Sequence, residues 1–187
     1  MKIALSAGHW PRARGACSGE ICEHEQAAYW CAKVAQALPS YVQVYHVPTG
    51  PLADKVADIN AAKCDFAIEI HFNACGGCGA SGAETLYYPG SAEGKRAAEY
   101  LQRAMAGCGV RDRGVKEGWH RMDYPGRVDY DGDVDGDEKP DYFLRATNCT
   151  ALILEPEFIE NHHRFEELRP DMCRAIAAGI VEYLENR

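Results

Sequence analysis

The chain has 187 residues, 47% of them hydrophobic and 26% charged, which fits a single globular domain (residues 1–187) and excludes disordered and fibrous proteins. Its formal net charge of −8 disfavours nucleic acid as a partner, because that binding depends on basic surface. No apolar run approaches the roughly 20 residues of a membrane helix, so we expect no membrane insertion. The nine cysteines, an odd number, leave at least one thiol unpaired and favour a reducing compartment.

The first half of the chain alternates between strand and helix patterns. A short apolar strand at residues 3–6 leads to Gly8 and His9. A helix is predicted to begin at Glu23, because apolar residues follow it along one stripe with a 3.6-residue period: Ala27, Trp30, Cys31, Val34 and Leu38. The next predicted elements are a strand, a helix and a strand, at residues 41–46, 52–63 and 65–72. The last of these shows little polar alternation, so we expect it at the centre of the sheet.

The second half continues the alternation around one interruption. A strand is predicted at residues 83–88, Ser91 caps a helix through about Ala106, a buried strand covers 151–155, and Asn161 caps a last helix. The interruption, residues 116–141, is rich in Asp, Gly, Pro and Tyr and is predicted to be an acidic insertion before the last strand. The pattern predicts an α/β fold: a twisted, mostly parallel or mixed sheet with helices on both faces, in one domain.

Three predicted strands end in a side chain that can bind a ligand, namely His9, His71 and Glu155. Ligands of open α/β sheets gather beyond the carboxyl ends of the strands, so these three side chains are expected to converge. Glu23 opens the first helix on its sheet-facing side, whereas Glu25 points to solvent. A carboxylate in that buried position costs desolvation unless a cationic group receives it.

Two histidines, one carboxylate and an open position are the ligand set of a catalytic zinc, with a further glutamate as general base. Each residue also has an ordinary structural interpretation. A lone histidine at a strand end usually makes a structural hydrogen bond, and a glutamate in a first helical turn usually interacts with the helix dipole. Spacing alone therefore leaves both interpretations open.

At these residues the chain resembles the zinc-dependent N-acetylmuramoyl-L-alanine amidases of the amidase_3 type, which cleave peptidoglycan. The similarity runs through most of the chain and rests on ordered motifs: SAGH (6–9), CEHE (22–25), IHFNA (70–74), SGAET (81–85), RGVK (113–116) and LEPEFI (154–159). The resemblance implies that His9, Glu23 and His71 bind Zn²⁺ and that Glu155 is catalytic. It further implies hydrolysis of the amide bond between N-acetylmuramic acid and the L-alanine of the stem peptide.

The chain departs from the family pattern near these motifs. Trp10 follows His9 where the family usually has glycine, and Glu69 stands where it often has serine. Glu69 lies two residues before His71, on the same face of the strand, and either orients a ligand histidine or pairs with a basic residue. Phe72 replaces a small residue and is expected to narrow the cleft, and Glu157 replaces a glycine.

An acidic run inside the insertion resembles the first half of an EF-hand calcium loop, with Asp131, Asp133, Asp135 and Asp137 as candidate Ca²⁺ ligands. The closing glutamate of such a loop is missing, because its position is occupied by Tyr142. A solvated acidic loop is the alternative. Aromatic residues of the insertion either contact sugar or peptide at the cleft or anchor the loop: Trp119, Tyr124 and Tyr130.

The pair Cys75 and Cys78 follows the central strand in a CxxC arrangement. Such a pair is a redox centre, half of a structural zinc site or a simple loop whose thiols can form a disulfide. No second CxxC is present and the pair does not open a helix, which favours the simple loop. His162 and His163 adjoin the predicted helix cap and are not expected to be ligands.

The leading hypothesis is therefore a zinc amidase acting on peptidoglycan. Two alternatives have other functions: a non-catalytic peptidoglycan-binding protein with the same fold, and a calcium-regulated binding module. The first residues lack the apolar stretch of a signal peptide. Together with the compact length, this favours a phage or prophage endolysin that is made in the cytoplasm and acts on the cell wall after release.

Overall fold

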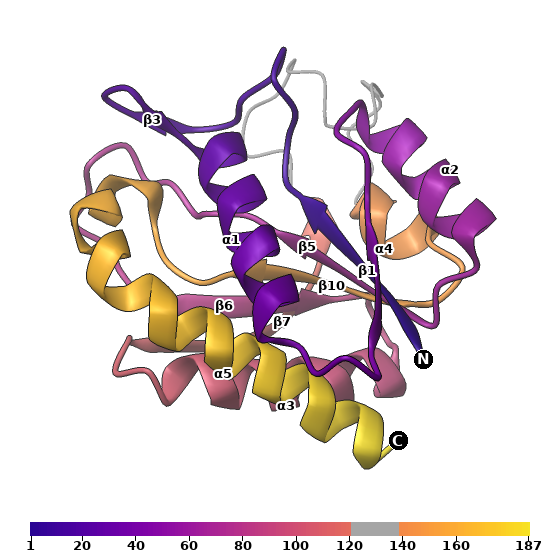
Figure 1. The fold of residues 1–187 in the computed structure, drawn as a ribbon. Coiled ribbons are helices and arrows are strands. Elements are labelled where there is room, and N and C mark those ends of the chain that lie inside the picture. Colours follow the sequence, from indigo (N-terminus) through magenta and orange to yellow (C-terminus); the bar gives the residue numbers. More distant parts are fainter. Residues whose placement is uncertain (121–138) are drawn as a thin grey trace.

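The computed structural model describes residues 1–120 and 139–187, which form a six-stranded sheet covered by helices on both faces (Figure 1). The sheet consists of β4 (Gln43–His46), β1 (Lys2–Ala7), β5 (Phe66–Ile70), β10 (Thr150–Glu155), β6 (Ala83–Tyr87) and β7 (Asp112–Glu117), in that order. Two further sheets have two antiparallel strands each: β2 (Cys17–Ser18) pairs with β3 (Ile21–Cys22), and β8 (Trp119–His120) pairs with β9 (Lys139–Pro140). The helices are α1 (Glu23–Ala37), α2 (Leu52–Ala62), α3 (Ala92–Ala106), α4 (Tyr142–Ala146), the 3₁₀ helix η1 (Ile159–Arg164) and α5 (Phe165–Glu185).

The sheet is mixed, as predicted. Strands β4, β1, β5 and β10 run parallel to one another, and β10 pairs antiparallel with β6. Strand β5 lies between β1 and β10 and every one of its residues is buried, which confirms its central position. The parallel order brings the carboxyl ends of β1, β5 and β10 to the same edge of the sheet.

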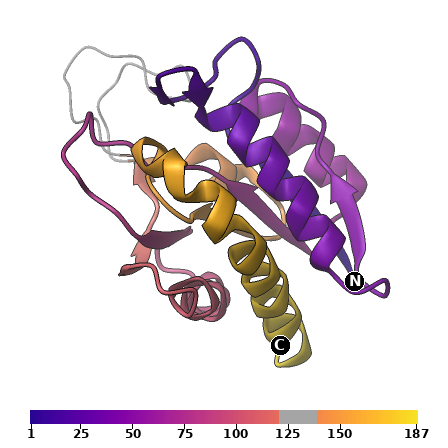
Figure 2. The same ribbon diagram turned by 60° about the vertical axis from the view of Figure 1, so that its left-hand side comes forward.

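Two cores separate the sheet from its helix layers. Apolar residues from alternate positions of β1, β5 and β10 pack under α1, α3 and α5, and Trp30 and Tyr183 are completely buried in this larger core. The other face packs small side chains such as Ala4 and Ala67 against α2 and α4. Figures 1 and 2 show α1 and α5 side by side over the larger core. None of the described helices is both long and apolar enough to cross a membrane.

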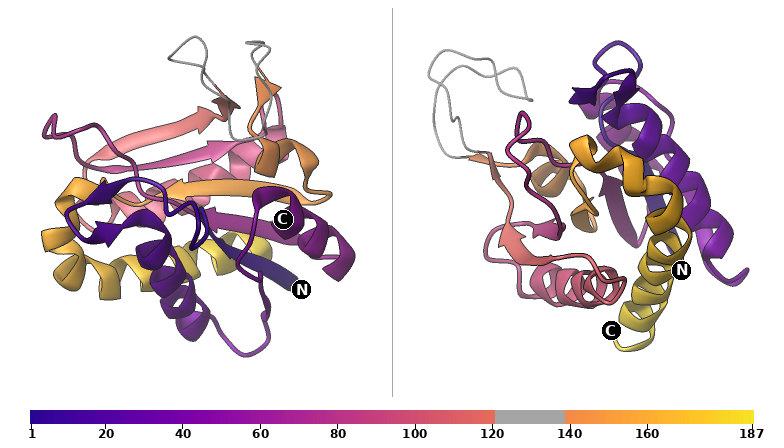
Figure 3. Two further views of the ribbon diagram at one scale, coloured as in Figure 1. Left: turned by 90° about the horizontal axis from the view of Figure 1, so that it is seen from above. Right: turned by 90° about the vertical axis from the view of Figure 1, so that its left-hand side faces the viewer.

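The hairpin of β2 and β3 lies at the amino end of α1, at the opposite end of the molecule from the chain termini (Figures 2 and 3). The disulfide Cys17–Cys22 joins its two strands directly before Glu23. This pairing was not predicted, and together with Cys75–Cys78 it leaves five free cysteines.

One local prediction is wrong. Asn161 does not cap the last helix: it lies inside η1, and its side chain donates hydrogen bonds to the Ala80 carbonyl and to Glu157. Phe72 lines the cavity beside His71, and its ring packs in the core against Trp30 and Phe165, with ring centroids 5.1 and 4.8 Å away. Adjacent residues of an extended chain point to opposite faces, so Phe72 is buried because His71 faces the sheet edge.

Candidate metal centre

His9 and His71 lie next to each other because β1 and β5 are neighbours in the sheet. The Gly8 amide donates to the Ile70 carbonyl over 2.8 Å, which extends the pairing beyond the end of β1. The two imidazole rings then meet edge to face with centroids 5.0 Å apart. His9 has a φ of 58°, a conformation that non-glycine residues rarely adopt and that is often found at functional sites.

Glu23, the first residue of α1, places its carboxylate between the two histidines. Its Oε2 lies 2.9 Å from His9 Nε2, and its Oε1 lies 2.8 Å from His71 Nδ1. The backbone amides of Ala16 and Phe72 each donate to this carboxylate over 3.1 Å. Glu23 is 4% exposed, so the sequence prediction of a buried carboxylate that needs a cationic partner is confirmed. Glu25 is exposed, also as predicted, and the structure pairs it with Arg14.

The charges of this cluster depend on one another. Burial opposes the ionisation of Glu23, but hydrogen bonds from His71 and His9 outweigh burial and hold the pKa of this carboxyl far below its usual range. Burial also opposes the charge on His71, yet hydrogen bonds to Glu23 and Glu69 raise the pKa of His71 well above its ordinary value. The cluster therefore favours a positive charge at its centre.

The donor set fits zinc. One ligand atom from each of His9, Glu23 and His71 lies within 4.8 Å of the others, and no other group of three such residues occurs in residues 1–120 and 139–187. Two imidazoles and one carboxylate with a further open position are typical ligands of a catalytic zinc. The structure thus brings together the three residues that the sequence predicted as ligands.

The side chains of His9, Glu23 and His71 occupy space that is free only because two neighbouring residues are glycines. A Cβ on Gly8 would lie 2.6 Å from the His71 ring, and a Cβ on Gly15 would lie 2.4 Å from His9 and 2.5 Å from Glu23. Gly15 also has a φ of +77°, which favours glycine. Sequence reasoning did not single out Gly15, because nothing in the sequence distinguishes it from other loop glycines.

Glu155, at the end of β10, lines the same cavity of about 320 Å³ as His9, Glu23 and His71. Its Oε2 is buried and has no hydrogen-bond partner within residues 1–120 and 139–187. Burial raises the pKa of Glu155 well above its ordinary value, and neighbouring carboxylates add to this effect against the opposing charge of His71. Trp119 also lines the cavity and is exposed at its rim.

The other sequence candidates lie elsewhere. His162 and His163 are in η1, apart from the group of His9, Glu23 and His71. The candidate calcium ligands and two aromatic residues of the insertion fall outside the described residues: Asp131, Asp133, Asp135, Asp137, Tyr124 and Tyr130. Their roles stay predictions.

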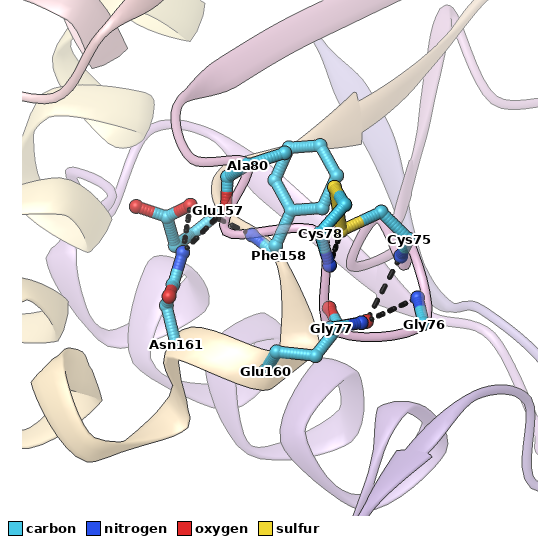
Figure 4. Close-up of a disulfide and its surroundings, with 9 residues drawn as sticks. All are labelled: Cys75, Gly76, Gly77, Cys78, Ala80, Glu157, Phe158, Glu160 and Asn161. Carbon is cyan, nitrogen blue, oxygen red and sulfur yellow. Dashed lines mark hydrogen bonds between the residues drawn. A yellow bond between two sulfur atoms is a disulfide. The ribbon is translucent and has the colours of Figure 1, made fainter.

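The loop after β5 is tied to the segment after β10 by two carboxylates, of which Figure 4 shows the contacts of Glu160. Glu160 Oε1 accepts hydrogen bonds from the amides of Cys75, Gly76 and Gly77, at 2.9, 2.8 and 3.4 Å. Glu157, whose role the sequence left open, accepts from the Gly82 amide over 2.8 Å. Cys75 and Cys78 form a disulfide within this loop, in agreement with the simple-loop interpretation.

Replacing Glu160 with alanine is expected to lower the free energy of unfolding by about 1–2 kcal/mol, because three amides lose a charged acceptor that water replaces only in part. Urea denaturation measures this change. The matched control is Glu167→Ala, which removes an exposed carboxylate from the first turn of α5 and should change stability by less than about 0.5 kcal/mol. Equal unfolding midpoints for the two variants would contradict the assigned role of Glu160.

Comparisons with known proteins agree with this geometry. Residues 3–186 match the family model Amidase_3, described as N-acetylmuramoyl-L-alanine amidase. No curated protein matches the chain closely enough to count as a relative. An N-acetylmuramoyl-L-alanine amidase from Clostridium difficile 630 has a similar structure, with a TM-score of 0.83 and 22% identity over 100% of this chain and 97% of that one.

Two further solved structures are similar. The catalytic domain of the CD27L endolysin targeting Clostridia difficile has a TM-score of 0.74 and 21% identity, over 97% of both chains. A putative N-acetylmuramoyl-L-alanine amidase from Neisseria meningitidis has a TM-score of 0.69 and 25% identity, over 98% of this chain and 96% of that one. These likenesses confirm the predicted α/β fold.

Proposed function

Since the chain belongs to the Amidase_3 family of N-acetylmuramoyl-L-alanine amidases, we propose that it is a zinc-dependent hydrolase of peptidoglycan. The bond cleaved is the amide between N-acetylmuramic acid and the L-alanine of the stem peptide. The observation that carries this proposal is the convergence of His9, Glu23 and His71 with Glu155 in one cavity.

His9 Nε2, His71 Nδ1 and the Glu23 carboxylate would hold the zinc ion. When bound, zinc lowers the pKa of a coordinated water toward about 7 and polarises a substrate carbonyl. Glu155 acts as general base: it takes the proton of the attacking water at Oε2, which no other group in the described part of the chain engages, and passes it to the departing L-alanine nitrogen. Trp119 at the cavity rim offers an apolar face to the substrate.

A non-catalytic wall-binding protein with this fold is the second candidate. Such a protein has no need of a buried carboxylate in the same cavity as His9, Glu23 and His71 whose Oε2 has no partner among the residues described, so Glu155 favours the enzyme. We further propose that the protein is made in the cytoplasm and reaches the wall after release, as an endolysin does.

Digestion of purified peptidoglycan by the zinc-loaded protein tests the function. We expect released stem peptides that begin with a free L-alanine amine, without new reducing sugar ends, and about one zinc per chain. The amine is measured by N-terminal labelling and mass spectrometry, and the metal by elemental analysis. Binding to the wall without peptide release would favour the second candidate, and new reducing ends would indicate cleavage of the glycan instead.

A further inference from the structure

A buried polar network lies directly behind His71 and has no place in the chemistry described above. It consists of Glu69 on β5, Lys55 on α2 and Ser6 on β1, whose exposed fractions are 2%, 2% and 0%. Glu69 precedes His71 by two residues, so both side chains point to the same face of the strand. Burying a carboxylate and an ammonium group costs free energy unless each finds its hydrogen-bond partners. The buried charges of Glu69 and Lys55 therefore depend on these defined contacts.

The two oxygens of Glu69 have different partners. Oε1 accepts hydrogen bonds from Ser6 Oγ over 2.7 Å and from Lys55 Nζ over 2.9 Å. Oε2 lies 3.0 Å from His71 Nε2. Because a carboxylate can only accept, His71 must donate through Nε2. In the neutral ring, Nδ1 then carries the lone pair, and Nδ1 is the atom that faces Glu23.

We propose that Glu69 is a positioning residue for the metal centre. It holds His71 in the tautomer and ring orientation that present Nδ1 to zinc, and Lys55 and Ser6 hold Glu69 in place. Partners of this kind behind metal ligands typically change metal affinity by about 10–100-fold. The proposal rests on the proposed zinc centre and adds residues that the family resemblance does not supply, because the family often has serine at the position of Glu69.

The Glu69→Gln substitution gives a directional test. Lys55 can only donate toward this side chain, so the amide oxygen of a glutamine will turn toward Lys55 Nζ and its NH₂ group will face His71 Nε2. His71 Nε2 then accepts this hydrogen bond, so the neutral ring carries its proton on Nδ1. A protonated Nδ1 has no lone pair with which to bind zinc. We expect zinc affinity to fall by about 10–100-fold, measured by competition with a chromophoric chelator.

Two further variants separate positioning from folding and from charge. The double variant Lys55→Met with Glu69→Leu removes both buried charges, so no ammonium group is left unpaired and the protein should fold. We expect its zinc affinity to fall less than that of Glu69→Gln. Glu25→Gln removes an exposed negative charge two residues from Glu23 without touching a histidine, and its zinc affinity should equal that of the wild type. In zinc-loaded wild type, ¹⁵N NMR of His71 should show a proton on Nε2 and coordination through Nδ1.

The outcomes are distinct. Wild-type zinc affinity in both Glu69→Gln and the double variant would overturn the proposal and leave Glu69 as a neutralising partner of Lys55. A His71 ring that binds zinc through Nε2 would overturn it as well, as would absence of zinc binding in the wild type. Zinc bound through Nδ1 with no release of stem peptides would instead refute the amidase function and leave the positioning role standing.

Discussion

Replacing Glu155 with glutamine is expected to lower the rate of stem-peptide release by about 10²–10⁴-fold, the usual contribution of a general base, while zinc stays bound. Glutamine keeps the size of the side chain but cannot accept the proton of the attacking water. Glu155 lines the cavity without belonging to the three-residue ligand cluster, so its loss should spare the metal. Turnover of peptidoglycan fragments and zinc content, measured on the same preparation, check both parts.

The matched control for this variant is Glu117→Gln. Glu117 is an exposed carboxylate at the end of β7 that accepts a hydrogen bond from Trp119 Nε1 at the cavity rim. The glutamine removes a carboxylate away from the reacting atoms, and its amide oxygen can still accept from Trp119 Nε1, so turnover should stay close to that of the wild type. A Glu155→Gln variant with near wild-type turnover would exclude Glu155 as the base, and loss of zinc would identify it as a ligand.

Much of the fold could be predicted because strand and helix periodicities alternate clearly. The predicted strands at 3–6, 65–72 and 151–155 correspond to β1, β5 and β10, with ends that differ by at most two residues. Ser91 caps α3 as expected, since its hydroxyl accepts from the Gly94 amide. These elements have apolar patterns that local sequence determines, and their order fixes the edge at which ligand residues gather.

Other elements have no such pattern. Strand β7 reads DRGVKE and lies at the edge of the sheet with no fully buried residue, so apolar alternation is absent. The two-residue strands β2 and β3 depend on a hairpin and on the Cys17–Cys22 disulfide, whose pairing cannot be deduced from cysteine spacing. Helix α4 has only five residues. Asp141 caps its amino end, because the Asp141 side chain accepts hydrogen bonds from the amides of Phe143 and Leu144.

The candidate site likewise contains residues that the sequence predicted and residues that it did not. His9, His71 and Glu155 were predictable as neighbours because each follows a strand of one parallel set. Glu69 was recognised near His71, but the choice between a histidine and a basic partner could not be made from sequence, and the structure shows both. The signal for Lys55 was weak: it lies beside Val56 on the buried side of α2, where a lysine is unusual.

Gly15→Ala is expected to lower zinc affinity by about 10–100-fold, as disturbance of ligand-orienting contacts does, and to lower amidase turnover with it. The new Cβ would lie 2.4 Å from His9 and 2.5 Å from Glu23, so at least one of these two ligands must move. Positive φ adds a backbone cost of about 1–2 kcal/mol. Chelator competition measures zinc affinity, and urea denaturation of the metal-free protein measures the backbone cost.

Gly19→Ala separates the two causes. Gly19 lies in the same hairpin region with a φ of +62°, but a Cβ there meets nothing within 4 Å. Both variants should therefore lose about 1–2 kcal/mol of stability from the left-handed backbone, whereas only Gly15→Ala should lose zinc affinity. Equal zinc affinities of Gly15→Ala and Gly19→Ala would show that the loop around residue 15 can shift to accept the new Cβ without moving His9 or Glu23. If only Gly15→Ala loses zinc affinity, the metal centre requires a residue without a side chain at position 15. None of the sequence motifs that predicted the ligands includes this position.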